Sequence, residues 1–467
     1  MDWNVMSQMK NGNHVELLRI LSNENKFLKM FSTAHIGDIY AGYTGEEKQK
    51  EHIDADLEFI SKLTHDYCAY TNNDKVTVEP YDPKELFEQR KVPITPFADI
   101  NFADLTSNLT NSSELGTELK EKREKLLNIP LDDVLKKAYN NPDGATRMQK
   151  LYPELESNQT FGGMLNAIMG QFHRLNESDD YKDMRQMVQN SLDINRDRLF
   201  DATDPIGKIE KIYEQLGRSP YLKKFEYVPD WYGDILNWYL LLDMHGYQED
   251  KVNVTKGRKE TFKNTTNDAF HAAFASICDF YITNDEKSYK KTRAVYNKLG
   301  LNTIVLKPSE FVEYYNENLA IETVQQHLLT FLYLLRSPDF QFIEDEHSTL
   351  QSFYFRDFVL DYFTRAHISF DKSSGNSLTF LSKDKPTNGR WTFAIEVETL
   401  IDKLISFFGD DLDNYGPFQR DEDLGSNWIG RRWKLENTIF RLAMPNGWLQ
   451  LYMDSIYDEN ETIAVHE

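Results

Sequence analysis

The segment from residue 265 to residue 306 constrains the fold of this chain most strongly, because helix and strand signals alternate along it. "TTNDAFHAAFASIC" predicts a helix capped by Thr266 or Asn267, and "FYIT" predicts a short strand. "NDEKSYKKTRAVYNKLG" predicts a second helix that ends at Gly300, and "NTIVL" predicts a second strand. Strand, helix and strand in this order require a parallel sheet with a right-handed crossover.

The same segment repeats an Asn-Asp pair, which ends in Asp268 and then in Asp285. A helix of about eleven residues rises roughly 16 Å, and a short strand with its connection advances about 15 Å. Because the helix runs antiparallel to the strand, both acids are expected at the carboxyl edge of the sheet. Close carboxylates repel unless a cation lies between them, and oxygen-rich clusters suit Mg²⁺ or Mn²⁺. In the alternative interpretation, Asp268 only favours the helix dipole and Asp285 only caps the next helix.

Two further acids lie near the N-terminus. "MDWNVMSQMK" places Asn4 two positions after Asp2. "FSTAHIGDIYAGY" carries Asp38 on a short expected helix, which Ser32 or Thr33 can cap. The chain therefore offers four acids for one cluster.

These motifs together resemble the PIN-domain nucleases. That family has a first strand ending in D-x-N, an acid on an early helix, an acid at a later helix start and a T-x-D strand end. The matching residues in this chain are, in that order, Asp2 with Asn4, Asp38, Asp268, and Thr283-Asn284-Asp285. The resemblance covers about residues 1–71 and 257–316.

The resemblance implies a Rossmann-like α/β/α fold and metal-dependent hydrolysis of phosphodiester bonds, most often in single-stranded RNA. It implies that Mg²⁺ or Mn²⁺ is held by catalytic carboxylates, here those of Asp2, Asp38, Asp268 and Asp285. Asn4, Thr283 and Asn284 are expected to orient these acids through hydrogen bonds.

Three features differ from the family pattern. Only Met1 stands before Asp2, where the family has several apolar strand residues, so that strand either lies upstream or is missing from this chain. Asp38 stands where the family usually has Glu. The sequence between the two matching blocks is far longer than in a minimal PIN domain.

The composition of the sequence and its helix and strand signals predict four segments. Residues 1–71 and 257–319 form the two parts of a PIN-like α/β domain, and residues 72–256 form a helical insertion or subdomain. Residues 320–467 form a C-terminal α+β module of unknown role, with hairpins expected to turn at residues 373–376 and 445–447.

The net charge of −22 argues against tight, nonspecific duplex binding through a broad basic surface. A local basic run follows Asp285 on the same predicted helix: Lys287, Lys290, Lys291 and Arg293. Such a run is usually a solvated helix face, and the functional alternative is contact with the phosphates of a bound RNA.

The chain carries two cysteines, no apolar run long enough for a membrane span and no signal-peptide pattern. These features favour a cytoplasmic protein without disulfides. Two other functions compete with the ribonuclease: a catalytically silent PIN-like scaffold for a protein partner, and a phosphoesterase acting on DNA or nucleotides. A protein regulator or antitoxin, the oligomeric state, and a toxin, defence or housekeeping role stay open.

Overall fold

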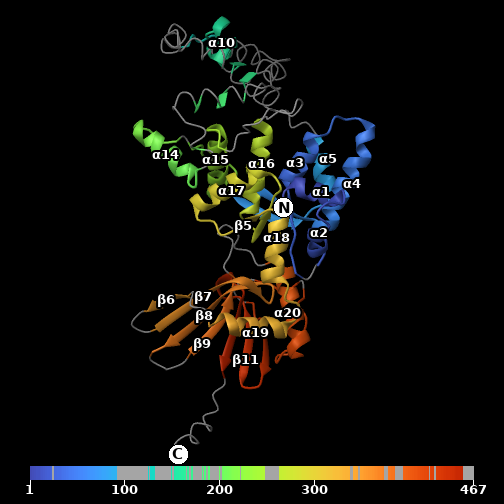
Figure 1. Cartoon of the computed structure of the whole chain (residues 1–467). Helices are drawn as coiled ribbons and strands as arrows, with labels where there is room; N and C mark the ends of the chain where they lie inside the picture. Colours follow the sequence, from blue (N-terminus) through green and yellow to red (C-terminus); the bar gives the residue numbers. More distant parts are fainter. Residues whose placement is uncertain are drawn as a thin grey trace, which may run out of the picture.

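The chain forms a mixed α/β upper part and a lower part built on a large antiparallel sheet (Figure 1). This computed structural model describes residues 1–23, 26–91, 202–220, 222–247, 262–336, 340–344, 348–372, 377–383, 393–419, 421–424 and 428–455, with shorter runs and single residues between 125 and 199. No helix in these ranges is both long enough and apolar enough to cross a membrane.

Two small sheets form the centre of the upper part. In the first, β1 (Phe31–Ser32) runs parallel to β2 (Tyr67–Asn72), which pairs antiparallel with β3 (Lys75–Pro80). In the second, β4 (Phe280–Ile282) runs parallel to β5 (Ile304–Leu306). The strand β3 corrects the expected domain boundary, because residues 75–80 extend the first sheet instead of opening a helical insertion.

Helices surround these sheets. The N-terminal group comprises α1 (Trp3–Lys10), α2 (Val15–Leu21), α3 (Thr33–Ala41), α4 (Glu47–Thr64) and α5 (Pro83–Lys91). The later group comprises α14 (Pro205–Gln215), α15 (Asp230–Met244), α16 (Phe262–Ala275), α17 (Glu286–Leu299) and α18 (Pro308–Tyr314), which a short π-helix continues over Tyr315–Leu319. Between the groups lies the short helix α10 (Glu154–Ser157). About half of the expected insertion, residues 72–256, lies outside the described residues.

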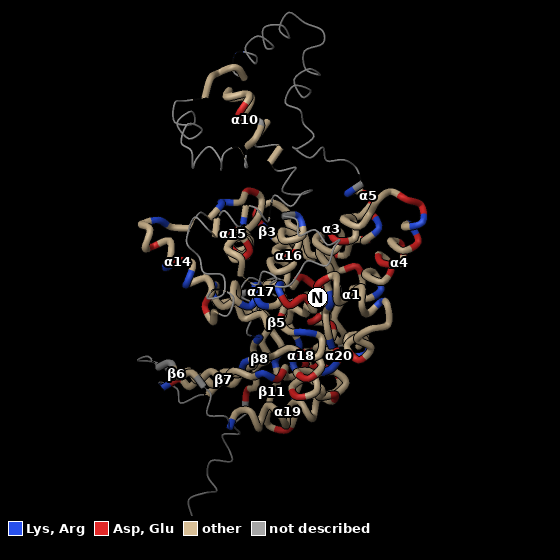
Figure 2. Tube along the Cα trace, turned by 45° about the horizontal axis from the view of Figure 1, so that its top comes forward, with Lys and Arg blue, Asp and Glu red and all other residues tan. Residues whose placement is uncertain are grey.

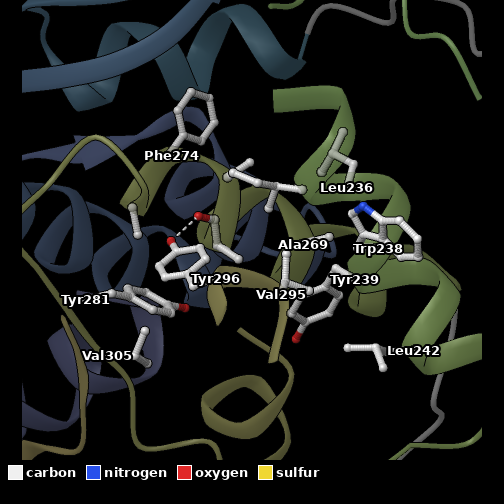
Figure 3. Packing of buried hydrophobic residues seen from close by; sticks show 14 of the residues in the cluster. Leu236, Trp238, Tyr239, Leu242, Ala269, Phe274, Tyr281, Val295, Tyr296 and Val305 are labelled. Atoms are coloured by element: carbon white, nitrogen blue, oxygen red, sulfur yellow. Dashed lines mark hydrogen bonds between the residues drawn. The ribbon is translucent and has the colours of Figure 1, made fainter. Parts of the chain in front are cut away.

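The later helices pack around one apolar core (Figure 3). Trp238, Tyr239 and Leu242 of α15 contribute to it together with Ala269 of α16 and Val295 of α17. Three aromatic residues of α15 are buried: Tyr232, Trp238 and Tyr239. This packing fixes α16 and α17, the two helices that carry Asp268 and Asp285.

The lower part contains seven antiparallel strands in the order β10-β11-β12-β9-β8-β7-β6. Their bounds are β6 Phe340–Glu344, β7 Ser348–Val359, β8 Phe363–Asp371, β9 Ser377–Ser382, β10 Arg431–Leu435, β11 Thr438–Ala443 and β12 Gln450–Ser455. The helices α19 (Val324–Leu334) and α20 (Ala394–Phe408) contribute to its core. A 3₁₀ turn at Pro445–Gly447 joins β11 to β12, as expected. The other expected turn, at residues 373–376, lies outside the described residues, but the strands on either side of it pair antiparallel.

The predicted strand–helix–strand unit is confirmed, with one correction. The chain follows β4, α17 and β5 in the predicted order, and Gly300 ends α17 with a φ of 64°. However, α16 begins at Phe262, so neither Thr266 nor Asn267 caps it and Asp268 does not lie in its first turn. The proposed effect of the helix dipole on Asp268 therefore has no basis.

Candidate functional site

Asp2 lies at the carboxyl end of β4. Its backbone N–H donates to the carbonyl oxygen of Ile282 over 3.0 Å. Its side chain caps α1, because Oδ1 accepts from the backbone N–H of Val5 at 2.9 Å. Oδ2 accepts a hydrogen bond from the hydroxyl of Thr283. Asp2 is buried and fully engaged with neighbouring residues.

Thr283 connects Asp2 to Asp285. While its hydroxyl donates to Asp2, its Oγ1 also accepts from the backbone N–H of Asp285 at 3.2 Å. Asp285 is the N-cap of α17, where Oδ1 accepts from the N–H of Ser288 at 2.8 Å. The expected cap is therefore present, and Oδ2 of Asp285 takes no part in it. Thr283 is fully buried, so it holds both acids in fixed positions.

Asp38 is held by two side chains of α16. Its Oδ1 accepts from Nδ2 of Asn267 at 2.9 Å, and its Oδ2 lies 2.7 Å from Nε2 of His271. Sequence reasoning missed these contacts, although the spacing of four residues places Asn267 and His271 on one helix face. Burial opposes the charged form of His271, but the Asp38 carboxylate raises its pKa overall.

The pKa of Asp268 records how close the acids are to one another. This pKa is raised from 3.8 to about 8, chiefly by burial and in addition by the charges of Asp285 and Asp38. Lys291 and His271 act in the opposite direction with smaller effect. Among the described residues, Asp268 forms no hydrogen bond or ion pair. Asp38, Asp268 and Asp285 therefore form one electrostatic cluster, and Thr283 ties Asp2 to it. Acidic residues lie beside the N-terminus in Figure 2.

His35 bonds to the backbone next to Asp2. Its Nδ1 accepts from the backbone N–H of Ser32 at 3.0 Å, so its Nε2 carries the proton and donates to the carbonyl oxygen of Met1 at 2.9 Å. Burial and the neighbouring His271 lower the pKa of His35, which keeps the ring neutral. The two rings are nearly perpendicular, with centroids 4.5 Å apart. His35 thus fixes the backbone just before Asp2.

The side chains of the other two candidate residues, Asn4 and Asn284, bond to a residue other than an acid. Asn4 and Asn284 are exposed, and each forms a hydrogen bond with Gln8, over 3.0 Å and 3.2 Å. Their hydrogen bonds therefore do not orient an acid as expected.

The four basic residues of α17 differ in their exposure to solvent. Lys291 is buried in an ion pair with Asp243 of α15, so it does not belong to a solvated helix face. Lys290 lies 3.3 Å from Glu286 on the surface, and exposed Arg293 donates to the Tyr289 hydroxyl over 2.6 Å. Lys287 is partly exposed. Three of the four cations therefore face the solvent.

The acidic cluster provides oxygen ligands alone, the donor set that Mg²⁺ and Mn²⁺ prefer. In the described part of the chain, no three His, Cys, Asp or Glu side chains are already gathered tightly enough to hold a metal ion. However, the charges of Asp285 and Asp38 oppose ionisation of Asp268. A cation between the carboxylates would offset this repulsion. Asp268 and Asp285, with Asp38 near them, are the carboxylates that could hold a divalent cation, and Asp2 already has protein partners on both oxygens.

Comparisons of the chain with protein-family models, with curated proteins and with solved structures found no match.

Proposed function

We propose that this chain is a PIN-type, metal-dependent endoribonuclease that hydrolyses single-stranded RNA in the cytoplasm. The observation that carries this proposal is the clustering of Asp38, Asp268 and Asp285, with the pKa of Asp268 raised to about 8. Strongly perturbed acids of this kind are typical of functional sites. The parallel pairing of β4 with β5 and the crossover helix α17 support a Rossmann-like arrangement for this part of the chain.

Each residue has a definite part in the proposed chemistry. A bound Mg²⁺ or Mn²⁺ polarises the phosphate and lowers the pKa of a water molecule. Asp268 and Asp285 would hold the cation, with Asp38 and Asp2 as further carboxylates. Thr283 keeps Asp2 and Asp285 in position, and His271 does the same for Asp38. Lys287, Lys290 and Arg293 contact the RNA backbone and supply the positive charge that the acidic chain lacks overall.

The test is cleavage of a single-stranded RNA in Mn²⁺ by the full chain and by Asp268→Asn and Asp285→Asn. We expect each substitution to lower the cleavage rate at least ~100-fold, because each removes one charge that holds the cation. Asp230→Asn, at the exposed start of α15, is the matched control and should cleave normally. Melting temperatures of all variants check folding. Undiminished cleavage by both site variants would remove the proposed role of these acids.

One observation favours the catalytically silent scaffold as a second candidate. Asp38 is already bound by Asn267 and His271, and Asp2 by Val5 and Thr283, so two of the four acids have protein partners without a metal. Titration with Mn²⁺ separates the two functions, because a nuclease site raises the melting temperature on binding the ion and a scaffold does not. The same cleavage assay with DNA and nucleotide substrates tests the phosphoesterase alternative.

A further inference from the structure

Arg90, in the last turn of α5, lies beside Asp38. Its Nη1 donates to the carbonyl oxygen of Thr33, at the start of α3, over 3.3 Å. Gly37 leaves room for this approach, because a Cβ atom there would lie 3.3 Å from Nη2 of Arg90. The same Cβ atom would lie 3.5 Å from Nδ2 of Asn267, the amide that donates to Asp38. The guanidinium is therefore a close neighbour of the hydrogen bond between Asn267 and Asp38.

A buried contact one turn earlier on α5 sets the position of Arg90. Phe87 is only 1% exposed, and the centroid of its ring lies 5.9 Å from that of Tyr40 and 5.7 Å from that of Tyr43. Tyr40 lies on α3, and Tyr43 follows the end of this helix closely. Aromatic pairs at these separations stabilise packing. They anchor α5, and Arg90 with it, to the helix that carries Asp38.

The charge of Arg90 is available to a ligand. The residue is exposed, and among the described residues it forms no ion pair and has Thr33 as its only hydrogen-bond partner. The guanidinium therefore keeps further N–H donors. Burial lowers the pKa of Arg90, but the charge of Asp38 opposes this shift, so the group stays protonated. A planar guanidinium matches two oxygens of one phosphate group.

The acids of the candidate site lie between Arg90 and the cations of α17. Figure 1 and Figure 2 both show the helices in the order α17, α16, α3 and α5, and neighbours in this series contact each other. Asp285 caps α17, Asp268 lies on α16 and Asp38 lies on α3. Asp285 and Asp38 both raise the pKa of Asp268, in agreement with a place between them. Positive charge therefore stands at both ends of this row of acids.

We propose that Arg90 binds a phosphate of the RNA strand at the Asp38 end of this row, opposite the cations of α17. The inference rests on the proposed function and narrows its substrate. A strand that runs from α17 to α5 meets a cation on each side of the carboxylates, which otherwise repel its phosphates. The substrate must then carry phosphates on both sides of the bond that is cleaved. The site accordingly selects an oligonucleotide over a nucleotide or a dinucleotide.

The first test measures RNA binding without cleavage, in the full chain that carries Asp268→Asn and Asp285→Asn. The measurement is fluorescence anisotropy of a labelled single-stranded RNA of about eight nucleotides. We expect Arg90→Met to weaken binding ~10-fold and to lower the slope of log Kd against log salt by about 0.7, because one phosphate contact is lost. Arg90→Lys keeps the charge and should keep the slope.

Lys84→Met, at the exposed start of α5, is the matched control and should bind RNA normally. Melting temperatures of all variants check folding. If Arg90 only stabilises the end of α5, Arg90→Met lowers the melting temperature and leaves the salt slope unchanged. That result would overturn the proposal.

The second test locates the phosphate that Arg90 binds. It uses a series of RNAs in which one phosphate at a time is replaced by a neutral methylphosphonate. We expect one position where this replacement weakens binding ~10-fold when Arg90 is present, but less than ~2-fold in Arg90→Met, because the contact is already lost. Equal losses in the two proteins at every position would show that Arg90 contacts no phosphate.

Cleavage by the unmodified chain in Mn²⁺ separates this inference from the proposed function. If the chain cleaves RNA and Arg90→Met binds and cleaves as Lys84→Met does, the inference is wrong and the proposed function stands. If RNA binding depends on Arg90 as expected but the chain does not cleave, the phosphate contact stands and the nuclease function is wrong. Absence of RNA binding overturns both. Cleavage of a dinucleotide as fast as of the longer RNA would overturn the inference alone.

Discussion

Asp268 differs from the other three acids because it has no hydrogen-bond or ion-pair partner among the described residues. Asp2, Asp38 and Asp285 accept hydrogen bonds from Thr283, from His271 and from the start of α17. Among the described residues nothing similar contacts Asp268, and two carboxylates lie close to it. A carboxylate in this position is costly to ionise in the absence of a cation. The pH at which Asp268 loses its proton therefore measures the repulsion among the acids of the cluster.

The first prediction at the residue scale concerns pH. The pKa of Asp268 rises from 3.8 to about 8 on folding, so the folded state binds this proton more tightly than the unfolded state. The free energy of unfolding should therefore fall as pH rises from about 4 to about 8, by up to about 1.4 kcal/mol per pH unit. Asp268→Asn removes this dependence. Urea denaturation without metal, at about pH 5.5 and about pH 8, measures it in both proteins.

The control for this experiment is Asp230→Asn, which changes an exposed acid on α15. It should keep the pH dependence of the unmodified chain. If Asp268→Asn and the unmodified chain lose stability in parallel between these pH values, Asp268 ionises normally and the cluster is not electrostatically strained.

At the scale of elements, a buried charge network connects α15 to α17 beside the acids. Lys291 of α17 and Asp243 of α15 form its centre, with side chains only 5% and 4% exposed. Tyr181 donates to Asp243, and Arg185 lies 3.4 Å from it. Lys291 also lowers the pKa of Asp268. The network therefore orients the helix that begins at Asp285 and moderates the charge of the cluster.

We expect Lys291→Met to destabilise the protein by about 3 kcal/mol, because it leaves Asp243 buried with less compensating charge. Lys290→Met is the matched control on the same helix. It breaks only a surface pair with Glu286 and should cost less than about 1 kcal/mol. The measurement is urea denaturation of the three proteins. A loss no larger than that of Lys290→Met would show that Lys291 contributes little, and recovery in Lys291→Met/Asp243→Asn would confirm the pair as the cause.

The elements show what sequence alone can predict. The order β4, α17, β5 follows from local signals: β-forming residues, a capping Asp285 and a glycine at position 300. The predicted start of α16 is wrong, since the helix begins at Phe262. Asn267, which was expected to cap it, bonds instead to Asp38, 229 positions away, and no local signal reveals that contact. The burial of Lys291 depends in the same way on Asp243 of another helix. Local sequence patterns thus do not predict contacts between distant segments of the chain.

At the scale of the whole molecule, charged side chains join the lower sheet to the upper part. Lys383, directly after β9, lies 2.8 Å from Asp279 and 3.4 Å from Glu396 of α20. Lys26 lies 3.1 Å from Asp361, on the turn between β7 and β8. Asp279 immediately precedes β4, the strand that leads to Asp285. The C-terminal module is therefore bonded directly to the strand that positions the candidate site.

The last prediction tests this connection through Lys383, whose side chain is only 13% exposed. Burial opposes its charge, but Asp279 and Glu396 raise its pKa overall, so it stays protonated. Lys383→Met removes the cation between these two acids, and burial together with the charge of Asp279 already raises the pKa of Glu396. We expect a loss of about 3 kcal/mol and separate unfolding of the two parts in calorimetry. Lys434→Met, on the exposed face of β10, should unfold as the unmodified chain does. Identical transitions in both variants would show that the two parts are held together by their other contacts.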